Sequence, residues 1–200
     1  MNTQSKSSIR SLIFVNLTVI VFAVLQDWSM STILWSYWMQ SVIIGLFQYK
    51  KIMDLKKFST EGMKQDGVQI ENTQKEKRKM AHFFLFHYGA FHAAYLLFLN
   101  EIDGILDWTA IAIAAGLFFA NHFHSYIENR SVDSSRNIPH LGTMVAIPYL
   151  RIMPMHLLIA FAAGQVTTTF WLIVFLLMKT VADVVMHKIE HSKKKFHAKA

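Results

Sequence analysis

The sequence contains no cysteine, and only 16% of its residues are charged. Without cysteine the chain cannot form a disulfide, an iron–sulfur cluster or a thiolate-bound metal site, so any metal or haem must be bound by His, carboxylate, Met or Tyr side chains. Glycine is also scarce, with 8 residues in the chain, which gives little indication of the broken helices of many transporters. The serine elbow, the phosphate-binding glycine loop and the dinucleotide-binding fingerprint are missing. These absences exclude the usual signatures of soluble hydrolases and nucleotide-binding enzymes.

Long apolar runs dominate what is present, and 53% of the residues are hydrophobic. Each run has about 20 residues, which at 1.5 Å per residue crosses a hydrocarbon layer of about 30 Å. We expect six spans, at residues 9–26, 31–49, 80–99, 108–127, 144–163 and 169–188. The predicted fold is therefore all-α: a six-transmembrane-helix bundle that forms a single integral membrane domain over residues 1–200.

Lysine and arginine are unevenly distributed between the expected spans. Two lie in the N-terminal segment, nine in the 50–79 loop, two in residues 128–143 and five from Lys188 onward, together 18 of the 20. The segments on the other side contain none, so the positive-inside rule places both termini and the 50–79 loop in the cytoplasm. We expect a multi-pass protein of the cell membrane, with that loop as a solvated connector. Because topology explains the positive charge, the expected partners are the lipid bilayer and a homo-oligomer or membrane complex, and not nucleic acid.

Ionisable residues gather in the cytoplasmic half of the expected bundle. Lys179, Asp183 and His187 are spaced four apart and share one helix face, whereas His122 and His124 point about 200° apart, and polar neighbours favour His122 as the inward residue. Charged groups in a bilayer cost roughly 3 kcal/mol each, so this clustering predicts a functional polar site. The predicted metal ligands are His87, His122, His156, Asp183 and His187, and the supporting polar residues are Gln40, His92, Ser125, Asn129, Arg151 and Lys179.

Five stretches of the sequence resemble a family of multi-pass prokaryotic membrane proteins. They are "YWMQSVIIG" from Tyr37, "FHYGAF" from Phe86, "HFHSYIEN" from His122, "PYLRIMPMH" from Pro148 and "KTVADVVMH" from Lys179, with the motifs FHYG, PYxR and KTxxDxxxH. The resemblance implies no activity, because none is established for that family. It implies a membrane bundle whose polar core consists of His87, His122, Arg151, His156, Asp183 and His187. One departure is Gln40, which stands where a glutamate is expected and puts a charge-based role there in doubt.

The predicted ligand set contains only nitrogen and oxygen donors, which suits a transition metal such as Zn, Fe or Cu. Asp183 and His187 have the spacing at which two helical side chains can reach one ion. Histidine pairs on facing helices, either His87 with His187 or His122 with His156, can instead hold a b-type haem. Either group would support redox or hydrolytic chemistry, although the residues assign no catalytic role and leave open whether the chain is an enzyme.

Other functions remain open from the sequence alone. Lys179 and Asp183 have the chemistry of a proton relay, which fits a proton-coupled transporter or permease. A non-catalytic subunit of a membrane complex is a further alternative. An ion pair of Asp183 with Arg151 or Lys179 can also serve only to hold helices together, since polar contacts between spans contribute about 1 kcal/mol.

Overall fold

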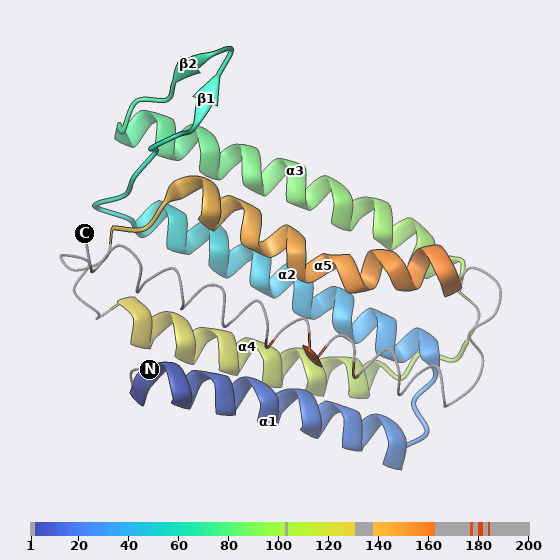
Figure 1. Cartoon of the computed structure of the whole chain (residues 1–200). Coiled ribbons are helices and arrows are strands. Elements are labelled where there is room, and N and C mark those ends of the chain that lie inside the picture. The colour runs from blue at the N-terminus through green and yellow to red at the C-terminus, as the bar shows by residue number, and fades with distance from the viewer. Residues whose placement is uncertain are drawn as a thin grey trace.

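The computed structural model describes residues 3–102, 104–130 and 138–162, together with Leu177, Thr180, Val181 and Val184; side chains are described from Ile13 onward, except at residues 128–130, 151 and 154–162. The described residues form α1 (Thr3–Leu25), α2 (Met30–Asp54), β1 (Lys64–Gln65), β2 (Val68–Gln69), α3 (Gln74–Asn100), α4 (Trp108–Arg130) and α5 (Leu141–Ala162). The five helices lie side by side along a common direction (Figure 1). The chain is thus helical, as the apolar runs predicted.

Several of these helices have the properties of membrane spans. Helices α2 and α3 and residues 108–127 of α4 are long and apolar enough to cross a membrane, and α1 and α5 contain shorter apolar stretches. Five of the six expected spans therefore coincide with helices of the described part. The sixth expected span, residues 169–188, lies outside the described residues except for the four named above.

Side-chain caps account for where two of the helices begin. Ser29 caps α2 by accepting a hydrogen bond from the amide of Thr32, and Thr73 caps α3 by accepting one from the amide of Glu76. The Thr73–Glu76 spacing is that of a capping box. Because α2 continues to Asp54 and α3 already begins at Gln74, the connecting loop is shorter than the expected 50–79.

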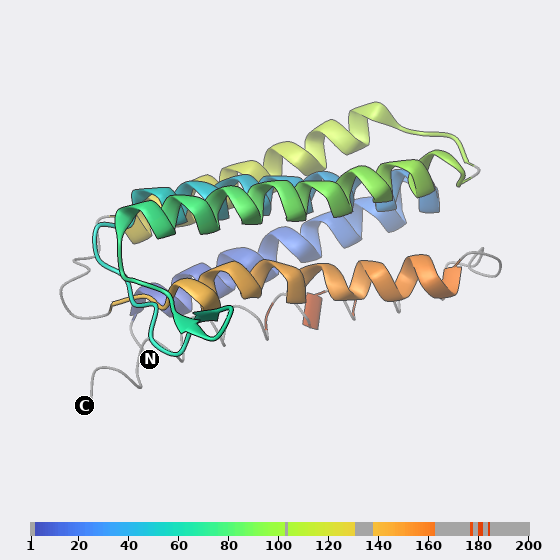
Figure 2. The ribbon, with the colours of Figure 1, turned by 90° about the horizontal axis from the view of Figure 1, so that it is seen from above.

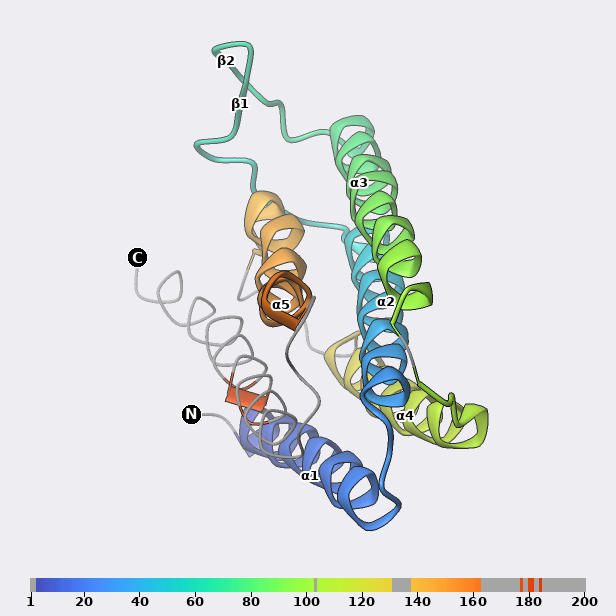
Figure 3. The ribbon, with the colours of Figure 1, turned by 90° about the vertical axis from the view of Figure 1, so that its right-hand side faces the viewer.

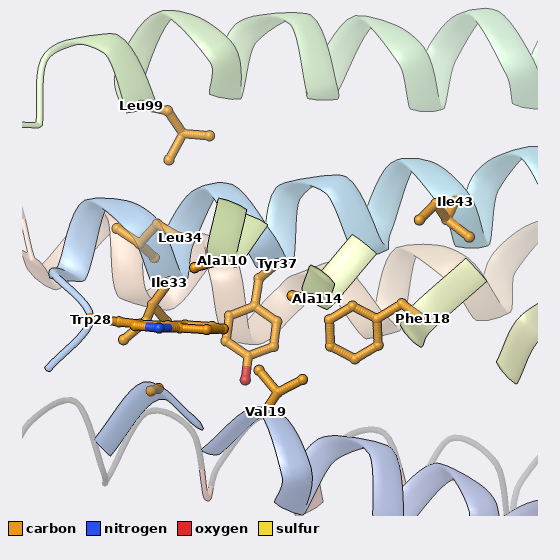
Figure 4. Packing of buried hydrophobic residues seen from close by; sticks show 11 residues of the cluster. Val19, Trp28, Ile33, Leu34, Tyr37, Ile43, Leu99, Ala110, Ala114 and Phe118 are labelled. Carbon is orange, nitrogen blue, oxygen red and sulfur yellow. The ribbon is translucent and has the colours of Figure 1, made fainter. Parts of the chain in front are cut away.

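Helix α2 occupies the centre of the bundle. It packs against α3, α4 and α5, while α1 packs against α4 and α3 against α5. The view along the helices shows α2 between α3 and α4 (Figure 3). Its two sides contribute to two separate apolar cores, one with α1 and α4 around Tyr37 and Phe118 (Figure 4), and one with α3 and α5 around Phe84 and Tyr88.

The connector between α2 and α3 is folded, whereas the sequence predicted only a solvated connector. Ser59 pairs with the segment before α5, because its amide donates to the Pro139 carbonyl and its own carbonyl accepts from the Leu141 amide, each at 2.9 Å. The β1–β2 hairpin follows, and it lies next to the first turns of α3 and α5 (Figure 2). Backbone pairing with residues 80 positions away, which no local pattern reveals, orders this connector.

Candidate functional site

The α2–α3 interface is built around Tyr88. Its ring lies against Gly45 so closely that a Cβ atom there would be 2.5 Å from Tyr88 Cε1, so only glycine fits. The Tyr88 hydroxyl lies 2.9 Å from the Ser41 hydroxyl and also donates to the Ser41 carbonyl at 3.1 Å. The missing side chain at Gly45 therefore brings the tyrosine into hydrogen-bonding reach of α2.

His92 continues this polar column one helical turn along α3. It is 4% exposed, and its ring stacks on Tyr88 with centroids 4.3 Å apart. Its Nδ1 lies 2.8 Å from the Tyr88 carbonyl, and since a carbonyl only accepts, Nδ1 carries the hydrogen and Nε2 is the basic nitrogen. Trp38 of α2 donates its indole N–H to the His92 carbonyl at 2.9 Å. This predicted supporting residue is thus buried with a fixed tautomer.

His87 lies at the neighbouring α3–α5 interface, and its ring is held on three sides. Nδ1 is 2.9 Å from the hydroxyl of Tyr149 on α5. Phe83 stacks on the ring at 5.2 Å, and Phe91 meets it edge to face at 5.1 Å. His87 is nevertheless exposed on the outside of the described helices. The contact at Nδ1 and the aromatic neighbours fix the ring orientation and leave Nε2 for another partner.

Tyr149 is held in place through the proline that precedes it. Pro148 has no N–H, so the Met144 carbonyl four residues earlier loses its usual partner within α5. Gln48 of α2 donates its side-chain amide to that carbonyl at 2.7 Å. Gln48 therefore satisfies an acceptor that Pro148 leaves open and ties the turn of α5 that carries Tyr149 to the central helix.

The predicted ligand His122 lies on α4, and not at the α3–α5 interface that contains His87. It is half-buried on α4 and stacks with Phe47 of α2, while His124 is exposed, in agreement with the helical phase. Because α2 separates α3 from α4 (Figure 3), His87 and His122 lie in different interfaces. No group of three or more His, Asp or Glu side chains in the described part of the chain could hold a metal ion.

The other predicted site residues are distributed as follows. Ser125 is half-buried on α4, and Gln40 is 2% exposed on α2, where its Nε2 has no hydrogen-bond partner among the described residues. The backbones of Asn129, Arg151 and His156 belong to α4 and α5, but their side chains lie outside the described set. Lys179, Asp183 and His187 lie outside the described residues altogether. The described residues therefore do not test whether Asp183 and its neighbours lie near His87.

The sequence did not predict a polar cluster that lies at the C-terminal end of α2. The Tyr126 hydroxyl of α4 donates to one oxygen of Asp54, and Lys50 forms an ion pair with the other oxygen at 2.9 Å. Asp54 lies within the expected solvated loop 50–79. A lone carboxylate in a polar segment does not reveal that a buried tyrosine of α4 donates a hydrogen bond to it. The contact links the ends of two predicted spans.

Lys77 forms a second link at this end and precedes the predicted span 80–99. It is 4% exposed, and its ammonium group donates to the carbonyls of Met53 and Leu55, each at 2.8 Å, at the last turn of α2. Burial lowers the pKa of Lys77, and Arg78 adds to this effect, whereas Asp54 opposes it. A cation at a helix C-terminus also compensates the partial negative charge of the last carbonyls.

Comparison with known proteins gives a family and no activity. The chain matches, over residues 1–200, the model of a group described as "Family of unknown function (DUF6498)", and it therefore belongs to that family. No curated protein and no solved structure matches the chain. Function must accordingly be argued from the geometry of its own residues.

Proposed function

We propose that this member of the DUF6498 family is a six-span protein of the cell membrane, with both termini cytoplasmic, that binds a transition metal ion or a b-type haem at His87. Three helices with the length and composition of spans support membrane insertion, and the uneven distribution of basic residues supports the orientation. The observation that carries the site is the His87–Tyr149 contact. The chemistry proposed for the bound group is redox or hydrolytic.

The surroundings of His87 fit a ligand histidine. Histidines that bind metals usually donate a hydrogen bond from the N–H of the second ring nitrogen, which fixes the tautomer and the ring orientation. With the proton on Nδ1, His87 donates to the Tyr149 hydroxyl, and Nε2 is then the ligand atom. Phe83 and Phe91, which contact the His87 ring, give the apolar surface that a haem macrocycle requires.

Further ligands are expected from the fifth and sixth spans. His156 follows Tyr149 by seven residues, two turns of a helix, and Asp183 and His187 are one turn apart. We propose these three as partners of His87 and leave out His122, which packs against α2. Arg151 is the proposed partner of a carboxylate, either Asp183 or a haem propionate, because a guanidinium binds carboxylates bidentately.

The test is an absorption spectrum and a metal analysis of the full-length protein in detergent. A Soret band selects haem, and stoichiometric Zn, Fe or Cu without that band selects a metal ion. His87→Ala should abolish binding, and Tyr149→Phe should weaken it by about 10- to 100-fold, as loss of an outer-shell contact does. His124→Ala is the matched control, because this exposed histidine has no proposed role. A wild-type protein with neither metal nor haem would overturn the proposal.

The orientation in the membrane has its own test. Because the chain contains no cysteine, a thiol reagent can label only the cysteines that are introduced. Single cysteines replace Glu71 in the folded connector and Glu101 at the end of α3, both exposed. An impermeant thiol reagent added to intact cells should label Glu101→Cys and leave Glu71→Cys unlabelled until the cells are opened. The opposite pattern would contradict cytoplasmic termini.

A second candidate is proton-coupled transport, which the buried polar face of α2 favours. Ser36, Gln40, Ser41 and Gln48 are all buried in the central helix, and His92 faces it from α3. Polar groups buried between spans often mark proton and substrate paths. In this candidate function Asp183 and Lys179 exchange the proton. It predicts proton uptake by liposomes that contain the protein, with loss in His92→Phe, and no bound metal or haem.

A further inference from the structure

The β1–β2 hairpin is a preformed element with its own internal bonds. Asp66 and Gly67 have φ of 51° and 81°, the left-handed pair that a two-residue hairpin turn requires. Thr60 donates its hydroxyl to the Ile70 carbonyl at 2.9 Å, and Gln69 donates its side-chain amide to the Thr60 carbonyl at 2.7 Å. The hairpin therefore presents its side chains in a fixed arrangement.

Two contacts define the position of the hairpin along the axis of the bundle. Lys79, the residue before the predicted span 80–99, donates to the side-chain oxygen of Gln65 at 2.9 Å. Met63 Sδ lies 3.2 Å from the position of a Cβ at Gly142, in the first turn of α5 and two residues before the predicted span 144–163. The hairpin thus lies level with the residues at which two predicted spans begin.

The hairpin also lies beside the bundle and not beyond its end. In the view along the helices it extends outside their outline (Figure 3), and in the side view it lies next to the first turns of α3 (Figure 1). At the level of the span ends, the space beside the helices is where lipid headgroups lie.

The exposed side chains suit that location. All residues of both strands are exposed, and Val68 next to the turn is 71% exposed. Lys56, Lys57 and Lys64 are exposed in the same connector. Acidic groups are exposed there as well (Glu61, Asp66 and Glu71), but seven of the basic residues in 50–79 are exposed, against these three acidic ones. At a membrane interface a valine can contact the acyl chains of the lipids, while neighbouring lysines contact the lipid phosphates.

We propose that the β1–β2 hairpin docks onto headgroups of anionic phospholipids in the cytoplasmic leaflet, with Lys64 at the phosphates and Val68 at the boundary of the acyl chains. This inference rests on the membrane orientation proposed above, and it is independent of any metal or haem. The bound lipid would hold the connector, and with it the beginnings of α3 and α5, at a fixed level.

The test uses the full chain with a single cysteine at Val68, labelled with a polarity-sensitive fluorophore. The protein is reconstituted into vesicles of phosphatidylcholine, alone or mixed with phosphatidylglycerol. We expect blue-shifted emission and quenching by spin-labelled lipid, both stronger with phosphatidylglycerol. Lys64→Gln should reduce the docked population about fivefold, which corresponds to about 1 kcal/mol for one basic residue near an anionic surface. Lys64→Arg should retain it.

Two further labelled positions separate the possible failures. Phe86→Cys, 75% exposed in the middle of α3, should be quenched by spin-labelled lipid in every vesicle if the chain spans the membrane. Glu71→Cys, exposed after the hairpin, should show the emission of a label in water. If Phe86→Cys is quenched and Val68→Cys behaves like Glu71→Cys, the hairpin proposal is wrong and the membrane assignment stands. If Phe86→Cys is not quenched, the membrane assignment itself fails.

Discussion

The most apolar windows of helices α2 and α3 have the same mean hydropathy, yet their environments differ. In the apolar window of α2, 56% of the residues are buried, against 28% in α3. Helix α2 packs against three neighbours and buries polar side chains on several sides, including Ser36, Gln40 and Gln48. Hydropathy measures how well a helix tolerates an apolar environment, and it does not reveal whether lipid or protein provides that environment.

Helix α3 buries a single stripe and exposes the rest. The buried residues follow the spacing of three and four: Lys77, Ala81, Phe84, Tyr88, His92, Tyr95 and Leu99. The opposite face carries Phe83, Phe86 and Leu97, all exposed. His87 lies at the edge between the two faces, where it meets Tyr149 and remains accessible. The histidine best placed to bind a ligand is therefore the exposed one, and the buried His92 belongs to the packing of α2.

The largest expected effect tests the two faces of α3. Phe84 is fully buried and Phe86 is 75% exposed, only two residues apart. Phe84→Ala should cost about 3 kcal/mol of unfolding free energy, because it leaves a cavity between α2, α3 and α5. Phe86→Ala should change it by less than about 0.5 kcal/mol. Thermal unfolding in one detergent compares the two, and equal losses would contradict the assignment of faces.

A smaller effect tests the close approach of α2 and α3. Gly45→Ala places a methyl group 2.5 Å from the ring of Tyr88, which Ser41 and His92 hold in position, so we expect a loss of about 2 kcal/mol from overpacking. Gly89→Ala on α3 is the control, since nothing lies within 4 Å of a Cβ there. The control should be neutral or stabilise by up to about 1 kcal/mol through helix propensity. A stable Gly45→Ala would show that Tyr88 has room to move.

The smallest expected effect compares two buried amides of α2. Gln48→Leu removes the donor that satisfies the Met144 carbonyl above Pro148, so we expect a cost of about 1.5 kcal/mol. Gln40→Leu removes an amide whose Nε2 has no hydrogen-bond partner among the described residues, and should be neutral or stabilise by about 1 kcal/mol. Denaturation of both variants in one detergent gives the difference. A costly Gln40→Leu would indicate that Gln40 binds a group essential to the fold.

Much of the secondary structure could be predicted from the sequence. The apolar runs are local features, and they predicted five of the described helices with their approximate ends. Helical phase predicted that His122 and His124 point apart, and the polar neighbours of His122 predicted that it is the more buried of the two. The folded connector could not be predicted, because Ser59 pairs with Pro139 and Leu141 across most of the chain. The Asp54–Tyr126 contact was hidden for the same reason.

The kind and order of the residues alone establish that the chain is helical, that thiolate chemistry is impossible and which residues share a face of each helix. These properties follow from composition and from the fixed 3.6-residue repeat. Three contacts follow instead from the packing of the helices: His87 meets Tyr149, His122 faces α2, and Gln48 donates to the Met144 carbonyl that Pro148 leaves without a partner in α5. Periodicity gives the direction of a side chain from its own helix axis. Which partner it meets depends on how helices distant in the sequence pack, and here a missing side chain at Gly45 and a missing N–H at Pro148 set that packing.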